Sequence, residues 1–262
     1  MNENIKAIFF DIDGTLLGLK SKEIPESTIE AIQQLKRKNI QVIVSTGRSY
    51  AHAKFLKSYG FECFITFNGS YCVAEDDEVI FKHVIDPEDI QALYQHLLYT
   101  EHFPVGVMTT DNSYISHVTD DVTTIFNLLK LQVPETLPLM EILNKEVLQL
   151  NLFVDEVKEQ RIINEVLKQC ESSRWCSTFI DVNAKGITKR IGMEHFLARH
   201  GIDLRNTMAF GDGGNDIQML HAAGIGIAMA NASDRVKQVA NYVTTTTEED
   251  GIWRALKRYE II

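Results

Sequence analysis

The sequence predicts an α/β protein: a Rossmann-like, doubly wound parallel sheet interrupted by an inserted α+β domain. Two observations point to the sheet. Short apolar runs alternate with amphipathic, helix-like segments at both ends of the chain, and runs such as VIVS at residues 42–45 are continuously apolar, as strands covered on both faces must be. A third observation points to the insertion, because this alternation stops near residue 82 and resumes after residue 186.

The first predicted elements form a strand–helix–strand unit. Residues 5–10 (IKAIFF) form an apolar strand, residues 25–39 an amphipathic helix with proline at its start, and residues 40–46 a second strand. A helix over residues 49–60 and a strand over residues 63–69 (CFITFNG) continue the pattern. The chain therefore opens as a β/α alternation.

The middle of the chain has a different texture. Helix-like and strand-like segments follow one another there in pairs, without continuing the parallel winding. We expect helices over 86–103, 120–132 and 157–170, and strands over 104–110, 113–118, 147–156 and 177–184. The predicted domains are a core of residues 1–81 and 187–262 and an inserted cap of residues 82–186.

The last part of the chain returns to the first pattern. We expect helices over 188–201, 215–224, 233–241 and 250–259, alternating with strands over 207–212, 225–229 and 242–245. No internal repeat, low-complexity stretch or long linker separates these segments.

Composition limits the classes of function. The net charge of −10 at pH 7 disfavours a nucleic-acid partner or an anionic membrane surface. No apolar run approaches the ~18 residues of a membrane span, and MNENIKAIFFD lacks the features of a secretion signal, so we expect a cytoplasmic protein. The four cysteines form no CxxC pair, which favours reduced, structural thiols. We expect a monomer or weak homo-oligomer.

Three predicted strands end in polar side chains. AIFF leads into Asp11 and Asp13, VIVS into Thr46, and MAF into Gly211 and Asp212. Ligands of open parallel sheets bind beyond the carboxyl ends of the strands, so these side chains are expected to meet. Two carboxylates ~4 Å apart repel by about 4 kcal/mol at an effective dielectric of ~20, which a cation would offset. Hard oxygen ligands of this kind favour Mg²⁺.

Each motif has a simpler interpretation. DIDG lacks the spacing of an EF-hand calcium loop, and GDGGND on its own could be a glycine-rich turn. GIGIAMA, residues 224–230, matches GxGxxA, but it leads into a strand and does not open a helix, which argues against a dinucleotide site. The eight histidines are scattered without the HExxH spacing of a metal site.

Taken together, four motifs resemble the haloacid dehalogenase superfamily. They occur in the family's order: DIDGT at 11–15, STGR at 45–48, KGITK at 185–189 and GDGGND at 211–216. More narrowly, the chain resembles a Cof-like hydrolase with a type-IIB cap, including TFNG at 66–69 and the segment from MANA to EEDGI. Arg190 and Ala230 depart from the family pattern, which often has glycine at those positions.

The resemblance implies a phosphatase that forms an aspartyl-phosphate intermediate. Asp11 would be the nucleophile, and Asp13 the general acid and then the general base. Mg²⁺ would be held by the Asp11 carboxylate, the Asp13 backbone carbonyl and Asp212. The substrate would be a small phosphorylated metabolite.

The resemblance also implies a set of phosphate-binding groups. The Thr46 hydroxyl and the backbone N–H groups of Ile12 and Gly47 would bind phosphoryl oxygens, and Lys189 would place a positive charge on the transferring group. Asn215 would contact the phosphate as well.

Three further assignments concern the surroundings of the phosphate. Asp216 would orient Lys189 or metal-bound water from outside the first ligand shell. Arg48 could reach a second anionic group, which favours sugar phosphates or similar metabolites. Within the cap, the candidates for specificity are His117, Arg174, Trp175 and Asn183.

Rival functions remain at this point. A phosphomutase or phosphotransferase of the same superfamily would interconvert phosphates without releasing them. A receiver module phosphorylated on aspartate would be about half as long and would need no cap. A non-catalytic binding protein would tolerate the loss of Asp11 or Asp13, and both are present.

Overall fold

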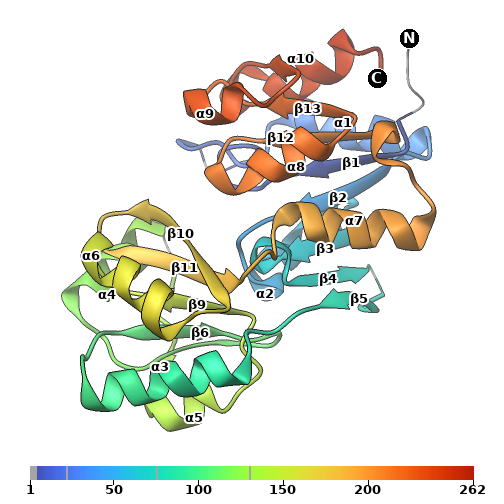
Figure 1. Cartoon of the computed structure of the whole chain (residues 1–262). Coiled ribbons are helices and arrows are strands. Elements are labelled where there is room, and N and C mark those ends of the chain that lie inside the picture. The colour runs from blue at the N-terminus through green and yellow to red at the C-terminus, as the bar shows by residue number, and fades with distance from the viewer. Residues whose placement is uncertain (1–4, 22, 75, 130) are drawn as a thin grey trace. The chain divides into compact units, whose positions relative to one another are not determined.

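The computed structural model describes residues 5–21, 23–74, 76–129 and 131–262. The chain divides into two compact units, which are described separately below (Figure 1). Unit 1 comprises Met1–Lys82 and Thr188–Ile262, and unit 2 comprises His83–Ile187. The insertion expected from the sequence, 82–186, differs from unit 2 by one residue at each end.

Unit 1 is built on a largely parallel sheet in the order β14-β13-β12-β1-β2-β3-β4-β5. The parallel strands are β1 (Ala7–Phe10), β2 (Gln41–Ser45), β3 (Cys63–Thr66), β12 (Thr207–Gly211), β13 (Ile225–Ala228) and β14 (Tyr242–Val243). Two antiparallel strands, β4 (Tyr71–Ala74) and β5 (Val79–Lys82), complete one edge. The predicted doubly wound α/β core is thus confirmed, while the β4–β5 edge was not predicted. Both strands have only four residues, and β5 is largely exposed although β4 is mostly buried.

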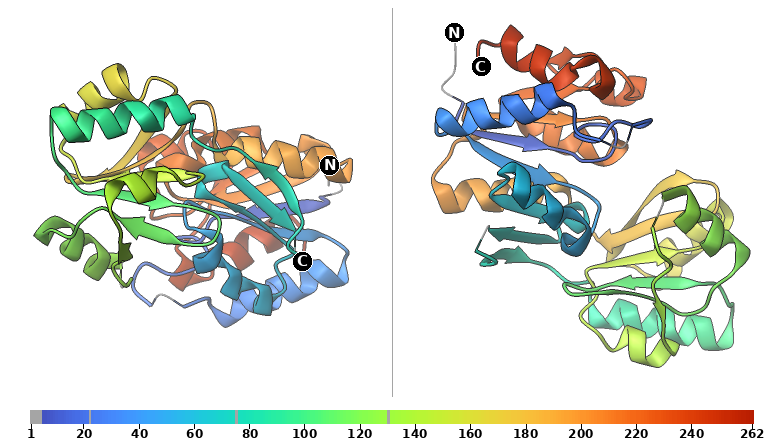
Figure 2. Two further views of the ribbon diagram at one scale, coloured as in Figure 1. Left: turned by 90° about the horizontal axis from the view of Figure 1, so that it is seen from below. Right: turned by 180° about the vertical axis from the view of Figure 1, so that it is seen from behind.

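Helices cover both faces of this sheet, as Figures 1 and 2 show for α7 and α1 on opposite faces. The helices are α1 (Glu26–Arg37), α2 (Tyr50–Ala53), α7 (Lys189–His200), α8 (Ile217–Ala222), α9 (Asp234–Lys237) and α10 (Gly251–Arg258). The helix expected over 49–60 is only α2 followed by a 3-10 segment, Lys54–Tyr59. Phe9 lies in the core under α7, where its ring meets that of Phe196 edge-on at 5.7 Å.

Unit 2 contains a second sheet, mostly antiparallel, in the order β10-β11-β9-β6-β7-β8. Its strands are β6 (Val105–Met108), β7 (Ser113–Ile115), β8 (Glu135–Thr136), β9 (Gln149–Leu152), β10 (Cys170–Cys176) and β11 (Phe179–Ala184). Its helices are α3 (Pro87–Tyr99), α4 (Asp120–Leu129), α5 (Leu139–Leu143) and α6 (Glu156–Arg161), which a π-helical turn extends through Ile162–Val166. The expected helix over 157–170 therefore ends early, and β10, β8 and α5 were not expected.

One face of the second sheet carries its main apolar core. Leu150, Leu152, Ile180 and Val182 pack there against buried residues of α3 and α5. Alternation along β9 and β11 consequently turns the neighbouring polar residues to the opposite face. A smaller apolar cluster joins α4 to that opposite face through Val122 and Phe179.

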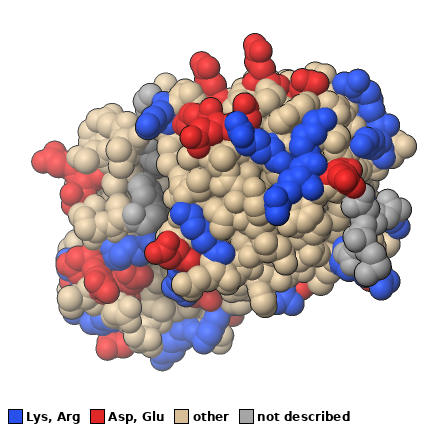
Figure 3. Space-filling model, turned by 90° about the horizontal axis from the view of Figure 1, so that it is seen from above, with Lys and Arg blue, Asp and Glu red and all other residues tan. Residues whose placement is uncertain are grey.

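Charged side chains of both signs are distributed over the surface. On the face in Figure 3, the Lys and Arg side chains are interspersed with Asp and Glu side chains. Within the described part of the chain, no helix is long and apolar enough to cross a membrane.

Candidate active site

The carboxyl ends of three adjacent strands bring the sequence motifs together. Strand β1 lies between β2 and β12, with Phe10 opposite both Val44 and Phe210. The next residue after β1 is Asp11, while Thr46 follows β2 and Asp212 follows β12. The chain leaves β1 toward β2 on one side and returns through β12 on the other, which is the position where open α/β sheets bind ligands.

A buried lysine joins two carboxylates at this end of the sheet. Lys189, the first residue of α7, has no exposed side-chain surface, and its Nζ lies 2.6 Å from Asp11 Oδ1 and 2.6 Å from Asp216 Oδ1. Burial alone would lower the pKa of Lys189, but the two carboxylates outweigh it and raise the pKa above its ordinary value. The ammonium is therefore a fixed positive charge.

Negative charge exceeds positive charge around this lysine. Asp11, Asp212 and Asp216 each offer one carboxylate oxygen within 4.8 Å of the others. Burial raises the pKa of Asp11 well above its usual value, with Lys189 opposing and the other two carboxylates adding to the shift. Burial and the charge of Asp216 raise the pKa of Asp212 to about 6. A divalent cation with oxygen ligands would relieve this repulsion, so the donor set fits Mg²⁺ or a similar ion.

The three carboxylates differ in how far their oxygens are already used. Asp216 Oδ2 accepts hydrogen bonds from the backbone N–H groups of Asp212 and Gly213, each at 2.9 Å, while Oδ1 accepts from Lys189. Asp216 thus holds the turn after β12 together. The structure places it beside Lys189, where the sequence analysis expected an orienting residue.

Two residues that support Asp212 were not predicted. Thr15 Oγ1 donates to Asp212 Oδ1 at 2.9 Å, and Asn231 Nδ2 donates to Asp212 Oδ2 at 2.8 Å. Gly14, with a φ of 87°, brings its backbone so close that a Cβ there would lie 2.3 Å from Asp212 Oδ2. Asn231 directly follows Ala230, where the family pattern often has glycine. That neighbouring position was the sequence signal that could have pointed to Asn231.

Asp13 lies apart from the buried carboxylates. Its exposed side chain accepts two hydrogen bonds from Arg48, from Nε at 2.7 Å and from Nη2 at 2.6 Å. Arg48 is therefore paired with Asp13 in this structure. Only the backbone carbonyl of Asp13 remains a potential metal ligand here.

The remaining predicted phosphate ligands also lie at this end of the sheet. Thr46 is buried, and its Oγ1 accepts a hydrogen bond from the Arg48 backbone N–H at 3.1 Å. Ile12 is fully buried directly after Asp11. Asn215 Nδ2 donates to Asn68 Oδ1 at 2.9 Å, which brings in a residue without a predicted role. TFNG had been noted in the sequence only as part of the resemblance.

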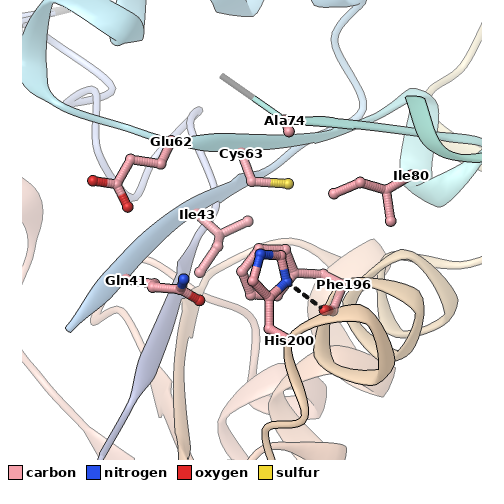
Figure 4. A pocket seen from close by; sticks show the side chains of 8 residues that line it. All are labelled: Gln41, Ile43, Glu62, Cys63, Ala74, Ile80, Phe196 and His200. Carbon is pink, nitrogen blue, oxygen red and sulfur yellow. Dashed lines mark hydrogen bonds between the residues drawn. The ribbon is translucent and has the colours of Figure 1, made fainter. Parts of the chain in front are cut away.

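A small pocket lies at the opposite end of the same sheet (Figure 4). Gln41 and Cys63, which begin β2 and β3, line it together with Phe196 and His200 of α7. His200 Nδ1 lies 2.9 Å from the Phe196 carbonyl oxygen. None of the described residues that line this pocket belongs to the four motifs, so it is not the candidate active site.

Known proteins share this architecture over nearly the whole chain. A model of the haloacid dehalogenase-like hydrolases matches residues 8–256. The chain is 34% identical to a protein of Bacillus subtilis named putative phosphatase YkrA, covering 98% of both chains. It is 31% identical to the 5-amino-6-(5-phospho-D-ribitylamino)uracil phosphatase YcsE of Bacillus subtilis, covering 98% of this chain and 96% of that one.

Solved structures agree with these sequence relatives. A phosphatase of the superfamily, BT1666 from Bacteroides thetaiotaomicron, is 33% identical with a TM-score of 0.91, covering 98% of this chain and 96% of that chain. The subclass IIB sugar phosphatase BT4131 is 38% identical with a TM-score of 0.89, covering 98% of this chain and 100% of that chain. The chain therefore belongs to the haloacid dehalogenase-like hydrolases and is a phosphatase of that superfamily.

Proposed function

We propose that this protein is a Mg²⁺-dependent phosphatase that hydrolyses small phosphorylated metabolites, such as sugar phosphates, through an aspartyl-phosphate intermediate. One observation carries the proposal. The Asp11 carboxylate is buried at the end of β1, 2.6 Å from the Lys189 ammonium and in a cluster with Asp212 and Asp216. This arrangement pairs a nucleophile with the fixed charge that phosphoryl transfer requires.

The first chemical step transfers the phosphoryl group to Asp11. An Asp11 oxygen forms a bond to phosphorus while the bond from phosphorus to the ester oxygen breaks. Asp13 gives its proton to that leaving oxygen. Lys189 already contacts Asp11 and stabilises the negative charge on the equatorial oxygens, and Thr46 donates its hydroxyl proton to one of them.

The second step hydrolyses the aspartyl phosphate. Asp13, now ionised, takes a proton from a water molecule whose oxygen attacks phosphorus, and the bond between phosphorus and the Asp11 oxygen breaks. Inorganic phosphate leaves and Asp11 is restored. The Asp13–Arg48 ion pair must open in each turnover, because Asp13 cannot reach the substrate while Arg48 holds both of its oxygens.

A metal ion fits beside these groups. Asp11 and Asp212 would hold Mg²⁺ with their carboxylates and Asp13 with its backbone carbonyl, while Asp216 stays committed to Lys189 and the backbone. When bound, Mg²⁺ supplies positive charge that offsets the repulsion between the carboxylates and the phosphate.

The similarity to the subclass IIB sugar phosphatase BT4131, which is 38% identical and covers 98% of this chain, supports sugar phosphates as substrates. Asn151 and Asp181 lie directly opposite each other on β9 and β11, and Asn151 Nδ2 donates to Asp181 Oδ1 at 2.7 Å. Both side chains point away from the apolar core.

The candidates for specificity named from the sequence fare differently. Arg174 Nε donates to Glu159 Oε2 at 2.6 Å, and its other donors bond to backbone carbonyls, so Arg174 supports the fold of unit 2. Asn183 is buried and donates to Gln149 Oε1 at 3.3 Å. His117 is exposed, and the side chain of Trp175 lies outside the described part of the structure.

Phosphate release from a panel of sugar phosphates and an aryl phosphate tests the proposal. We expect release with Mg²⁺, none in excess chelator, and none from Asp11→Asn, which also fails to bind a phosphoryl-mimicking fluoride. Asp203→Asn, a change at an exposed carboxylate, is the matched control and should behave as wild type. Full activity in chelator would contradict the role of the metal. Interconversion of sugar phosphates without phosphate release would favour a phosphomutase instead.

A further inference from the structure

The tight loop between β3 and β4 has an unusual backbone. Thr66 pairs with Tyr71 across the two strands, and between them Phe67, Asn68 and Gly69 have positive φ angles of 50°, 56° and 109°. All three are buried. The left-handed region is sterically unfavourable for a non-glycine residue, and a bulky aromatic residue adopts it rarely. Strained backbone of this kind persists where the surrounding structure holds it in place.

Backbone hydrogen bonds attach this loop to the second motif. The Phe67 N–H donates to the Arg48 carbonyl at 3.1 Å, and the Asn68 N–H donates to the Thr46 carbonyl at 3.0 Å. These hydrogen bonds fix the loop to residues 46–48, which carry the proposed phosphate-binding hydroxyl and N–H groups.

The Asn68 side chain contacts two further groups of the site. Its Oδ1 accepts the hydrogen bond from Asn215 Nδ2 at 2.9 Å, although the two residues are 147 positions apart in the sequence. The same oxygen lies where a Cβ at Gly47 would approach to 3.0 Å. Asn68 thus packs against the Gly47 backbone and fixes the amide of Asn215.

Gly69 brings the loop to the start of α7. A Cβ on Gly69 would lie only 2.1 Å from the carbonyl oxygen of Thr188, the residue before Lys189. This contact requires glycine. A single loop therefore contacts segments of the second, third and fourth motifs.

We propose that Asn68 is a positioning residue for the phosphate site: it holds the Asn215 amide and the Gly47 backbone in the geometry that binds the phosphoryl group. The inference rests on the proposed function, because the ligand is the phosphate of the substrate or product. Asn68 acts through its neighbours. It should therefore affect the binding of phosphate more than the chemical step.

The variant Asn68→Gly separates the side chain from the backbone. Glycine tolerates a φ of 56° better than asparagine, so the loop keeps its conformation and the protein stays folded, while Asn215 loses its acceptor. The variant loses one hydrogen bond, worth about 1 kcal/mol, and the groups that Asn68 held become less well fixed. We therefore predict a rise of about 5- to 20-fold in KM for an aryl phosphate. The Ki of inorganic phosphate should rise equally and kcat should change little, as expected when binding is lost uniformly.

Asn39→Gly is the matched control. Asn39 has nearly the same φ, 59°, but is exposed between α1 and β2, at the end of β2 opposite to Thr46. It should leave KM, Ki and kcat unchanged. A purely structural Asn68 would instead lower the melting temperature without moving KM or Ki, which would overturn the inference.

The double variant Asn68→Gly with Asn215→Ala tests the route of the effect. If Asn68 acts through Asn215, the double variant should raise Ki by less than the product of the two single effects. Independent, multiplicative effects would overturn the inference while the wild type still releases phosphate. A wild-type protein that hydrolyses no phosphomonoester would overturn the proposed function and this role together.

Discussion

Two ion pairs with buried carboxylates, one in each unit, differ in how completely their charges are matched. In unit 2, Arg174 faces a single carboxylate, Glu159, and bonds to three backbone carbonyls, those of Val154, Cys176 and Ser177. In unit 1, Lys189 contacts two carboxylates, Asp11 and Asp216, which cluster with a third, that of Asp212. The charges of Arg174 and Glu159 balance each other without a ligand. The cluster around Lys189 retains excess negative charge, which a cation would offset. Unmatched buried charge, and not burial alone, distinguishes a site from a structural pair.

The largest effect is expected from removing the charge in unit 1. Lys189→Met keeps most of the side-chain volume but leaves the phosphoryl oxygens without their fixed cation. Losing one such group costs about 10²- to 10³-fold in kcat, and more where it is charged and buried. Steady-state kinetics at saturating substrate measure the loss. Lys36→Met, which removes an exposed pair with Glu62 and a hydrogen bond to the Gly60 carbonyl, is the control, and an equal loss there would contradict the comparison.

Breaking the pair in unit 2 should change stability instead of chemistry. Arg174→Met leaves Glu159 buried without its partner, which we expect to cost about 3 kcal/mol of unfolding free energy. Denaturant unfolding measures this cost, and aryl phosphate hydrolysis well below the melting temperature should remain near wild type. A large fall in kcat with unchanged stability would place Arg174 in the active site.

The smallest effect concerns Asp181 of unit 2, whose carboxyl group accepts a hydrogen bond from the Asn151 side-chain amide. Burial raises the pKa of Asp181 to about 7, and the Asn151 hydrogen bond only partly opposes it. In the unfolded chain the group ionises near ~3.9, so the folded state binds the extra proton between about pH 4 and pH 7. The contribution of Asp181 to stability is therefore greatest at low pH and falls as pH rises through about 7.

Asp181→Asn removes this pH dependence while keeping an acceptor for Asn151. Partial exposure of the side chain weakens the effect, so we expect about 1–2 kcal/mol across that range. The difference in unfolding free energy between variant and wild type should shift in favour of the variant from pH 4 to pH 8. A constant difference would show that folding leaves the pKa of Asp181 at its ordinary value.

The sequence predicted the central strands of the first sheet better than the strands at the sheet edges. The doubly wound fold and the superfamily were predictable because apolar runs end in Asp11, Thr46 and Asp212, and that local pattern repeats along the chain. The strands at the edges of the sheets were harder to predict from the sequence. Strand β10 has few apolar residues and follows an amphipathic run, so residues 157–170 resembled one continuous helix.

Long-range hydrogen bonds were beyond the sequence. The sequence around Asn68 and Asn231 gives no sign of their distant partners, and only folding brings them to Asn215 and Asp212. Arg174 was a candidate for specificity because it lies in the inserted domain, but its donors are directed to neighbours within unit 2. Residue type indicates which contacts are possible, whereas packing decides which ones are made.

The pairing of β1 with β12 also sets the order in which the site can be assembled during synthesis. Ala7 pairs with Thr207, 200 positions later, and unit 2 is synthesised entirely between them. On the ribosome, β2, one neighbour of β1 in the sheet, emerges early, followed by β3. The other neighbour of β1, β12, emerges only after unit 2. Lys189, Asp212 and Asp216 are therefore synthesised long after Asp11. A nascent chain cannot perform phosphoryl transfer until its last quarter has emerged and β12 has paired with β1.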